Sequence, residues 1–232
     1  MRIAVAAFAA ALALGHGAAR ATTTTYLGDS YNGPVTPGAA EASFLAAVGT
    51  PAGTEGFESF TVTNSWPFTS LTTAGFVMAS PNSTAFGVFN DPQAGDHAAD
   101  GTQFIETHGQ SGTRELTFSG FAAPLSYFGL WVSDYEVAGA MTLTIDGTAA
   151  HTFTLIANGA GRDSGDTFFG LVTGPGEAFT TVRLDWELDY IGLDKVMFGA
   201  QAPGVPEPGA CALAAFGAGL AALARRRRRL AV

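Results

Sequence analysis

Cysteine is almost absent from this 232-residue chain, which contains a single one, Cys211. One cysteine excludes an internal disulfide framework and a cysteine-rich metal centre. Charged residues make up 13% of the chain, about half the share typical of globular proteins, whereas 47% of the residues are hydrophobic. This composition excludes a solvated, disordered chain, and the length favours one folded domain with appendages.

Basic residues are missing above all from the middle of the chain. Residues 22–208 contain four of them and all twenty acidic residues, which gives this stretch a formal charge of −16. Such a body repels phosphate backbones and anionic membrane surfaces and attracts cations, so we expect no nucleic-acid partner. The sequence also lacks a phosphate-binding Gly-Lys-Ser/Thr loop and the Gly-x-Ser-x-Gly element of hydrolases.

Residues 1–21 have the pattern of a secretory signal peptide. Arg2 precedes an uncharged, alanine-rich run that ends at Leu14 and is too short to span a bilayer. Ala19 and Ala21 are small residues at the two positions that signal peptidase recognises before its cleavage site, which predicts cleavage after Ala21. The alternative is a buried helix of the folded body.

Residues 202–232 form a tail of three parts. A short motif comes first, then an uncharged segment over residues 209–224, then a basic cluster. As a helix, the uncharged segment would be about 24 Å long, slightly short of a hydrocarbon core. The basic cluster would stay cytoplasmic and hold the folded body outside the inner membrane. A plain anchor without processing is the alternative. The motif is Val205, Pro206, Glu207 and Pro208, and the cluster is Arg225, Arg226, Arg227, Arg228 and Arg229.

This order of motif, apolar helix and arginines resembles the PEP-CTERM sorting signal. The resemblance implies recognition and cleavage near the motif by an exosortase, a membrane-embedded cysteine protease-transpeptidase. It also implies a Gram-negative bacterium that makes extracellular polysaccharide. The precursor would be tethered transiently to the inner membrane, and the product would reach the cell surface or the extracellular space.

Between the two ends we expect a loose lead-in over residues 22–53 and a β-sandwich domain over residues 54–201. One short helix is predicted from Pro37 to Gly49, which would stop it. Beyond it, short runs rich in Phe, Val, Thr and Leu are separated by Gly, Asn, Asp and Pro, which is typical of strands. The predicted strands are 56–62, 75–79, 86–89, 103–106, 114–119, 125–132, 141–145, 151–156, 167–172, 180–186 and 191–198.

The strand pattern indicates an all-β fold. Residues 141–145 alternate between apolar and threonine, so one face of that strand is buried, and Asp146-Gly147 predicts a hairpin into the strand at His151. We expect an antiparallel β-sandwich of jelly-roll or lectin-like type, flanked by an N-terminal signal helix and a C-terminal transmembrane helix. A barrel is the alternative.

Three short motifs of the body are similar to those of other exosortase-sorted surface proteins. They are residues 56–58 (Gly-Phe-Glu), 127–131 (Tyr-Phe-Gly-Leu-Trp) and 192–198 (Gly-Leu-Asp-Lys-Val-Met-Phe). The resemblance implies a lectin-like or carbohydrate-module-like sandwich.

Structural calcium is the one cofactor that the sequence suggests. Glu58 lies on the first predicted strand and Asp194 enters the last, and such strands often lie side by side at one edge of a sandwich. Calcium prefers carboxylate and carbonyl oxygens, and the body has few basic residues to pair with these acids. The alternative is two solvated surface acids. A loop that carries Asp91, Asp96 and Asp100 is a second candidate.

A catalytic alternative rests on Asp185, Glu187 and Asp189. Their spacing of two would place three carboxylates on one face of a strand, and strand residues two apart suit a pair of glycosidase carboxyl groups. Some jelly-roll glucanases carry a similar strand with the order Glu-x-Asp-x-Glu, from which this chain departs.

Aromatic side chains offer a surface for sugar stacking. Trp66, Trp131, Trp186 and Tyr190 are the candidates; core packing is favoured for Trp131, whereas Trp66 is expected to be exposed. We expect a structural, adhesive or carbohydrate-binding surface protein that is not an enzyme, with a secreted glycan hydrolase as the alternative. Its expected partners are signal peptidase, exosortase and extracellular polysaccharide.

Overall fold

The computed structural model describes residues 23–31, 34–82, 84–91, 96–108, 113–136, 139–156, 165–187 and 189–200. The predicted signal peptide (1–21) and sorting tail (202–232) lie outside these ranges. In the part of the chain that is described, no helix has the length and apolar character needed to cross a bilayer.

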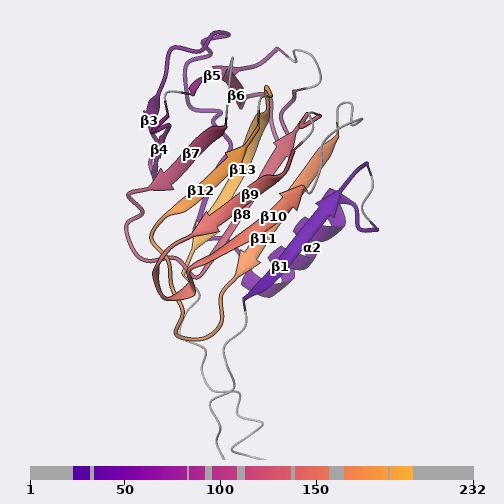
Figure 1. Cartoon of the computed structure of the whole chain (residues 1–232), viewed down its shortest axis with the longest axis vertical. Coiled ribbons are helices and arrows are strands. Elements are labelled where there is room, and N and C mark those ends of the chain that lie inside the picture. Colours follow the sequence, from indigo (N-terminus) through magenta and orange to yellow (C-terminus); the bar gives the residue numbers. More distant parts are fainter. Residues whose placement is uncertain are drawn as a thin grey trace, which may run out of the picture. The chain divides into compact units, whose positions relative to one another are not determined.

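The described body consists of two antiparallel sheets (Figure 1). A seven-stranded sheet has the order β1-β11-β8-β13-β6-β5, with β2 paired to β13, and a six-stranded sheet has the order β10-β9-β12-β7-β4-β3. The elements are β1 (Thr24–Asp29), α2 (Pro37–Val48), β2 (Gly53–Glu55), β3 (Ser70–Thr72), β4 (Val77–Ala79), β5 (Ala85–Phe89), β6 (Phe104–His108), β7 (Arg114–Ser119), β8 (Tyr127–Ser133), β9 (Met141–Ile145), η1 (Gly147–Ala149), β10 (His151–Ile156), β11 (Asp166–Val172), β12 (Val182–Trp186) and β13 (Gly192–Gly199).

The main core lies between the two sheets, which confirms the predicted sandwich. Every second residue of a strand points inward, and these residues are apolar. The six-stranded sheet contributes Phe118, Leu143 and Leu184, and the seven-stranded sheet contributes Phe128, Leu130 and Leu193.

The hairpin after residues 141–145 is also confirmed. Met141, Leu143 and Ile145 are buried, and the threonines between them are half-buried on the opposite face. Strand β10 pairs antiparallel with β9 through the short turn η1, and Gly147 begins that turn with a φ of 74°. A positive φ is easily adopted by glycine, which explains the Asp-Gly signal.

Within the predicted lead-in, residues 22–53, the described residues form elements that pair with or pack on the sandwich. Strand β1 extends the seven-stranded sheet by pairing with β11, and β2 pairs with β13. Helix α2 begins after Thr36, whose hydroxyl accepts a hydrogen bond from the Ala39 amide, and ends at Gly49 with a φ of 74°, as predicted. Figure 1 shows α2 beside β1 and β11, where it covers part of the outer face of the seven-stranded sheet.

The strand predicted over residues 56–62 is wrong. Strand β2 ends at Glu55, whose carboxylate accepts a hydrogen bond from the Phe57 amide at 2.8 Å. Phe57 then has a φ of 60°, in the left-handed region, which turns the chain and buries its ring against Phe60. Burial of that ring overrides the local strand pattern.

Asp146 joins the β9–β10 turn to the start of β12. Its Oδ1 accepts hydrogen bonds from the amides of Thr180 and Thr181 at 2.6 and 2.8 Å, and its Oδ2 accepts one from the Thr180 hydroxyl at 2.8 Å. Burial opposes ionisation, yet these donors hold the pKa of Asp146 below its usual range.

We expect Asp146→Ala to lower the free energy of unfolding at neutral pH by about 1–3 kcal/mol, because it leaves two amides without their acceptor. Asp185→Ala, which removes an exposed ion pair with Arg183, is the control and should cost about 0–1 kcal/mol. The native pKa of Asp146 is lowered, so its contribution is fully present above the ordinary aspartate pKa and disappears as the pH falls through the native one. Urea unfolding at several pH values measures both effects.

Candidate functional site at the loop-covered end of the seven-stranded sheet

One row of residues crosses the seven-stranded sheet near one end of the sandwich. Gly87, Glu106, Gly192, Ser133 and Asp166 stand opposite one another on β5, β6, β13, β8 and β11. Residues in such a row point to the same face, and their strand neighbours Ile105, Leu193 and Val132 lie in the core between the sheets. The row therefore faces outward, away from the six-stranded sheet.

The chain between residues 96 and 103 covers this outward face. Asp194 Oδ2 accepts hydrogen bonds from the amides of Ala99 and Asp100, both at 2.8 Å. Glu58 Oε1 accepts hydrogen bonds from the amides of Thr102 and Gln103 at 2.7 and 2.6 Å. The two carboxylates thus hold the same loop at two successive points.

The structure therefore brings Glu58 and Asp194, the predicted calcium ligands, to one loop. Burial raises the pKa of Asp194 to about 6, whereas the two backbone amides lower that of Glu58. In the residues described, no three His, Cys, Asp or Glu side chains are grouped so as to hold a metal ion. A calcium ion between Glu58 and Asp194 stays a prediction, and the oxygens they would offer already accept N–H groups.

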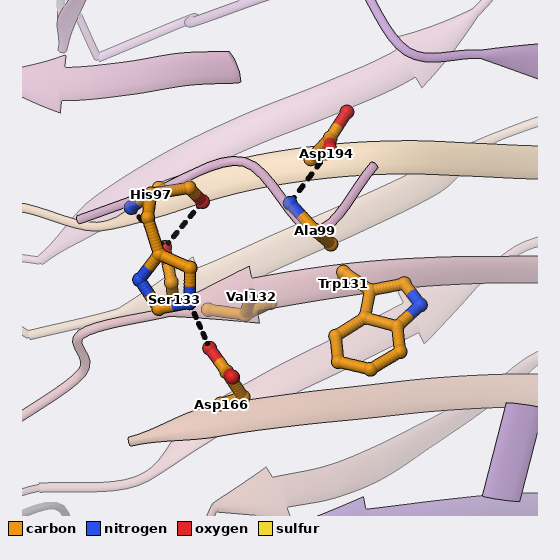
Figure 2. A pocket seen from close by; sticks show the side chains of 8 residues that line it. His97, Ala99, Trp131, Val132, Ser133, Asp166 and Asp194 are labelled. Atoms are coloured by element: carbon orange, nitrogen blue, oxygen red, sulfur yellow. Dashed lines mark hydrogen bonds and ion pairs between the residues drawn. The ribbon is translucent and has the colours of Figure 1, made fainter. Parts of the chain in front are cut away.

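A small pocket opens between this loop and the sheet (Figure 2). His97 Nε2 lies 2.9 Å from Asp166 Oδ1, and the Ser133 hydroxyl accepts a hydrogen bond from the His97 amide and donates one to its carbonyl. Because that hydroxyl bonds to the backbone and the imidazole faces Asp166, the three residues do not form a nucleophilic triad. The lining residues are His97, Ala99, Trp131, Val132, Ser133, Asp166, Gly192 and Asp194.

Buried carboxyl groups gather next to this pocket. Burial, together with the charges of Glu106 and Asp134, raises the pKa of Asp96 to about 9. Burial also raises the pKa of Glu106 to about 7; the Trp66 indole lies near enough to lower it, although its N–H makes no regular hydrogen bond. Asp189 is buried as well and accepts a hydrogen bond from the Glu136 amide at 2.7 Å.

Glu106 and Asp134 were not predicted as site residues from the sequence. Glu106 and Phe104 lie two residues apart on β6 and therefore point to the same face of the strand. A large apolar residue on that face indicates that the face is covered by other parts of the protein, and hence that the acid beside it is buried. The covering loop leads directly into β6, but its contacts are with β13, which is distant in the sequence, so only the fold brings Asp96 over Gly192.

The candidate stacking residues separate into two groups. Trp66 and Tyr190 meet, with ring centroids 5.9 Å apart, and His108 lies between them at 4.3 Å from Trp66 and 5.3 Å from Tyr190. Trp66 is half-buried and Tyr190 is 40% exposed. Trp186 is buried in the core, and Trp131 packs on Phe168 near α2.

The predicted catalytic carboxylates do not share a strand face. Strand β12 ends at Trp186, so only Asp185 belongs to it, and Asp185 pairs with Arg183 at 2.9 Å. Glu187 follows the strand and is exposed. Asp189 is buried, and its carboxylate accepts a hydrogen bond from the Glu136 amide. The period-two arrangement that a glycosidase pair would need is absent from this described stretch.

The fold and site define a β-sandwich with a loop-covered acidic pocket on one sheet and an aromatic cluster beside it. Residues 204–229 match the model of the PEP-CTERM protein-sorting motif, so the chain carries this sorting signal, as the tail predicted. The signal indicates an exported, membrane-processed protein destined for the cell surface or the extracellular space.

Several solved structures are similar at low sequence identity. The K2 cleaved adhesin domain of Lys-gingipain is 15% identical, covering 63% of this chain and 97% of that one with a TM-score of 0.43. The K3 cleaved adhesin domain from Porphyromonas gingivalis w83 is 13% identical, covering 65% and 100% with a TM-score of 0.40. TmCBM61 in complex with β-1,4-galactotriose is 11% identical, covering 55% and 89% with a TM-score of 0.31. The comparison with curated proteins gives no match.

Proposed function

We propose that this protein is an exosortase-processed surface or matrix protein whose sandwich binds extracellular polysaccharide, in an adhesive or structural role and without catalysis. The sorting signal supports its destination. The alternation of successive strands between the two sheets from β6 to β9 and from β10 to β13 supports a jelly-roll, lectin-like version of the fold.

The observation that carries the binding proposal is the aromatic cluster of Trp66, His108 and Tyr190. Sugar rings present apolar faces that pack on aromatic rings, and the polar tip of an exposed tyrosine can bond to sugar hydroxyls. The charge of −16 over residues 22–208 favours neutral glycans over polyanionic ones, because like charges repel.

A glycan array with the full-length chain tests this proposal. We expect binding to at least one neutral glycan, and we expect Tyr190→Ala to weaken it about tenfold, since the loss of an aromatic contact is worth about 1 kcal/mol or slightly more. Tyr31→Ala is the matched control, because Tyr31 is similarly exposed, at 49%, but follows β1. If the chain bound no glycan, or if both variants lost binding equally, the binding proposal would be rejected and only a scaffold role would remain.

The non-enzymatic part of the proposal has its own test. A screen for hydrolysis of the same glycans should detect no turnover. Turnover that disappears in Glu187→Ala would replace the binding proposal with the hydrolase.

A further inference from the structure

Asp96 lies over the outward face of Gly192. A Cβ atom at residue 192 would make ordinary contact with Asp96 Oδ1, at 3.4 Å, and would collide with the Ser133 side chain. Gly192 stands between Glu106 and Ser133 in the sheet row. Asp96 and Glu106 are therefore both neighbours of Gly192 on the outer face of the sheet, close enough for the charge of Glu106 to act on Asp96.

Both carboxyl groups are buried without enough partners. Asp96 is 1% exposed and Glu106 is 2% exposed, and neither Asp96 Oδ1 nor Glu106 Oε2 has a hydrogen-bond partner among the described residues. A buried carboxyl oxygen without a donor is costly, and two in one place are costlier still. The Gly192 amide acts on Asp96 and the Trp66 indole lies near Glu106, but neither gives a hydrogen bond to these two oxygens, which stay available to a ligand.

Acidic groups lie around the pair. The negative charges of Glu106, Asp134 and Asp189 all act on Asp96 and raise its pKa. The nearby ammonium group of Lys195 lies 2.7 Å from Glu41 and 3.7 Å from Asp100, so it is engaged by other carboxylates. A dication would displace the proton that burial keeps on Asp96 and would offset the charges of both carboxylates at once.

We propose that Asp96 and Glu106 bind a divalent cation of the calcium type. Hard cations take carboxylate and carbonyl oxygens, and Ca²⁺ tolerates irregular geometry, whereas Mg²⁺ demands an octahedron and keeps several waters. Because no third acidic or histidine side chain joins them in the described residues, carbonyl oxygens and water complete the shell. This site differs from Glu58 and Asp194, whose oxygens hold the loop, and it does not depend on glycan binding.

Calcium titration of the full-length chain, stripped with EDTA, tests the site. Calorimetry should detect binding, and calcium at roughly a hundred times the dissociation constant should raise the melting temperature by several degrees. Asp96→Asn and Glu106→Gln should each weaken calcium binding roughly tenfold or more and lose most of the thermal shift.

The variants remain informative because they should fold. Without calcium, the raised pKa of Asp96 keeps its carboxyl group protonated, and a neutral amide resembles that protonated acid, so Asp96→Asn should melt no lower than the parent chain in EDTA. Asp185→Asn, on the six-stranded sheet, is the control and should keep the full calcium response. The proposal is overturned if calcium neither binds nor stabilises the parent chain, or if both variants respond like the parent. It is equally overturned if the response is lost only in Glu58→Gln and Asp194→Asn, which would place the ion at the terminal strands.

Discussion

Phe44→Ala should lower the free energy of unfolding by about 3–5 kcal/mol, the range for deleting a buried phenylalanine ring. Phe44 is the largest residue by which α2 contacts the outer face of the seven-stranded sheet, and it is fully buried there. Its ring packs on Tyr26, Tyr127 and Phe168 at centroid distances of 5.9, 6.1 and 5.7 Å.

Two glycines make room for that ring. A Cβ at Gly170 would lie 2.6 Å from Phe44 Cδ2, and one at Gly129 would lie 3.1 Å from Phe44 Cε1. Gly170→Ala should therefore also destabilise the parent protein, because real Cβ atoms do not approach so closely. In the Phe44→Ala background the same change should cost less, since the space is then free.

Urea unfolding of the four chains in this cycle measures the coupling. Ser43→Ala, an exposed change on the same helix, is the control and should stay within about 0.5 kcal/mol. Additive effects of Phe44→Ala and Gly170→Ala would contradict the packing described here.

Replacing Pro206, Glu207 and Pro208 by alanine should abolish processing of the tail. These residues lie in the segment that matches the sorting motif, and a proline pair keeps the chain extended for a protease, whereas alanine permits a helix to continue. We expect the triple variant to accumulate as a membrane-bound precursor, while the parent chain reaches the surface with a new C-terminus.

Cell fractionation and mass spectrometry of the C-terminus measure this outcome. Pro203→Ala is the matched control, because it removes a proline just before the segment that matches the motif and should leave processing intact. A triple variant that is cleaved and exported like the parent would contradict the role assigned to the motif.

Most elements whose residues alternate or carry a turn signal could be predicted from the sequence. The pattern of Met141–Ile145 and its Asp-Gly turn indicated the β9–β10 hairpin, and Gly49 indicated the end of α2. The strand at 56–62 was wrong because Phe57 turns the chain to reach the core, and β1 was missed because its threonine-rich residues are stabilised by pairing with β11.

The candidate site shows the same division. Trp66 and Tyr190 could be singled out from the sequence as candidate stacking residues. That they contact each other, with His108 between them, depends on the path of residues 63–66 alongside β5. Asp96 was singled out only as one acid of a loop. Its place over Gly192, beside Glu106, follows from the register of β6 and β13, which no local pattern encodes.

The sequence by itself indicated the destination of this protein, because the sorting motif over residues 204–229 is a linear pattern that does not depend on the fold. It also determined the all-β class, since alternation of side chains is a local property of a strand. Only the tertiary structure decided which carboxylates hold a loop and which lie buried together. That choice depends on contacts between distant strands, where the cost of burying a charge is set by its surroundings.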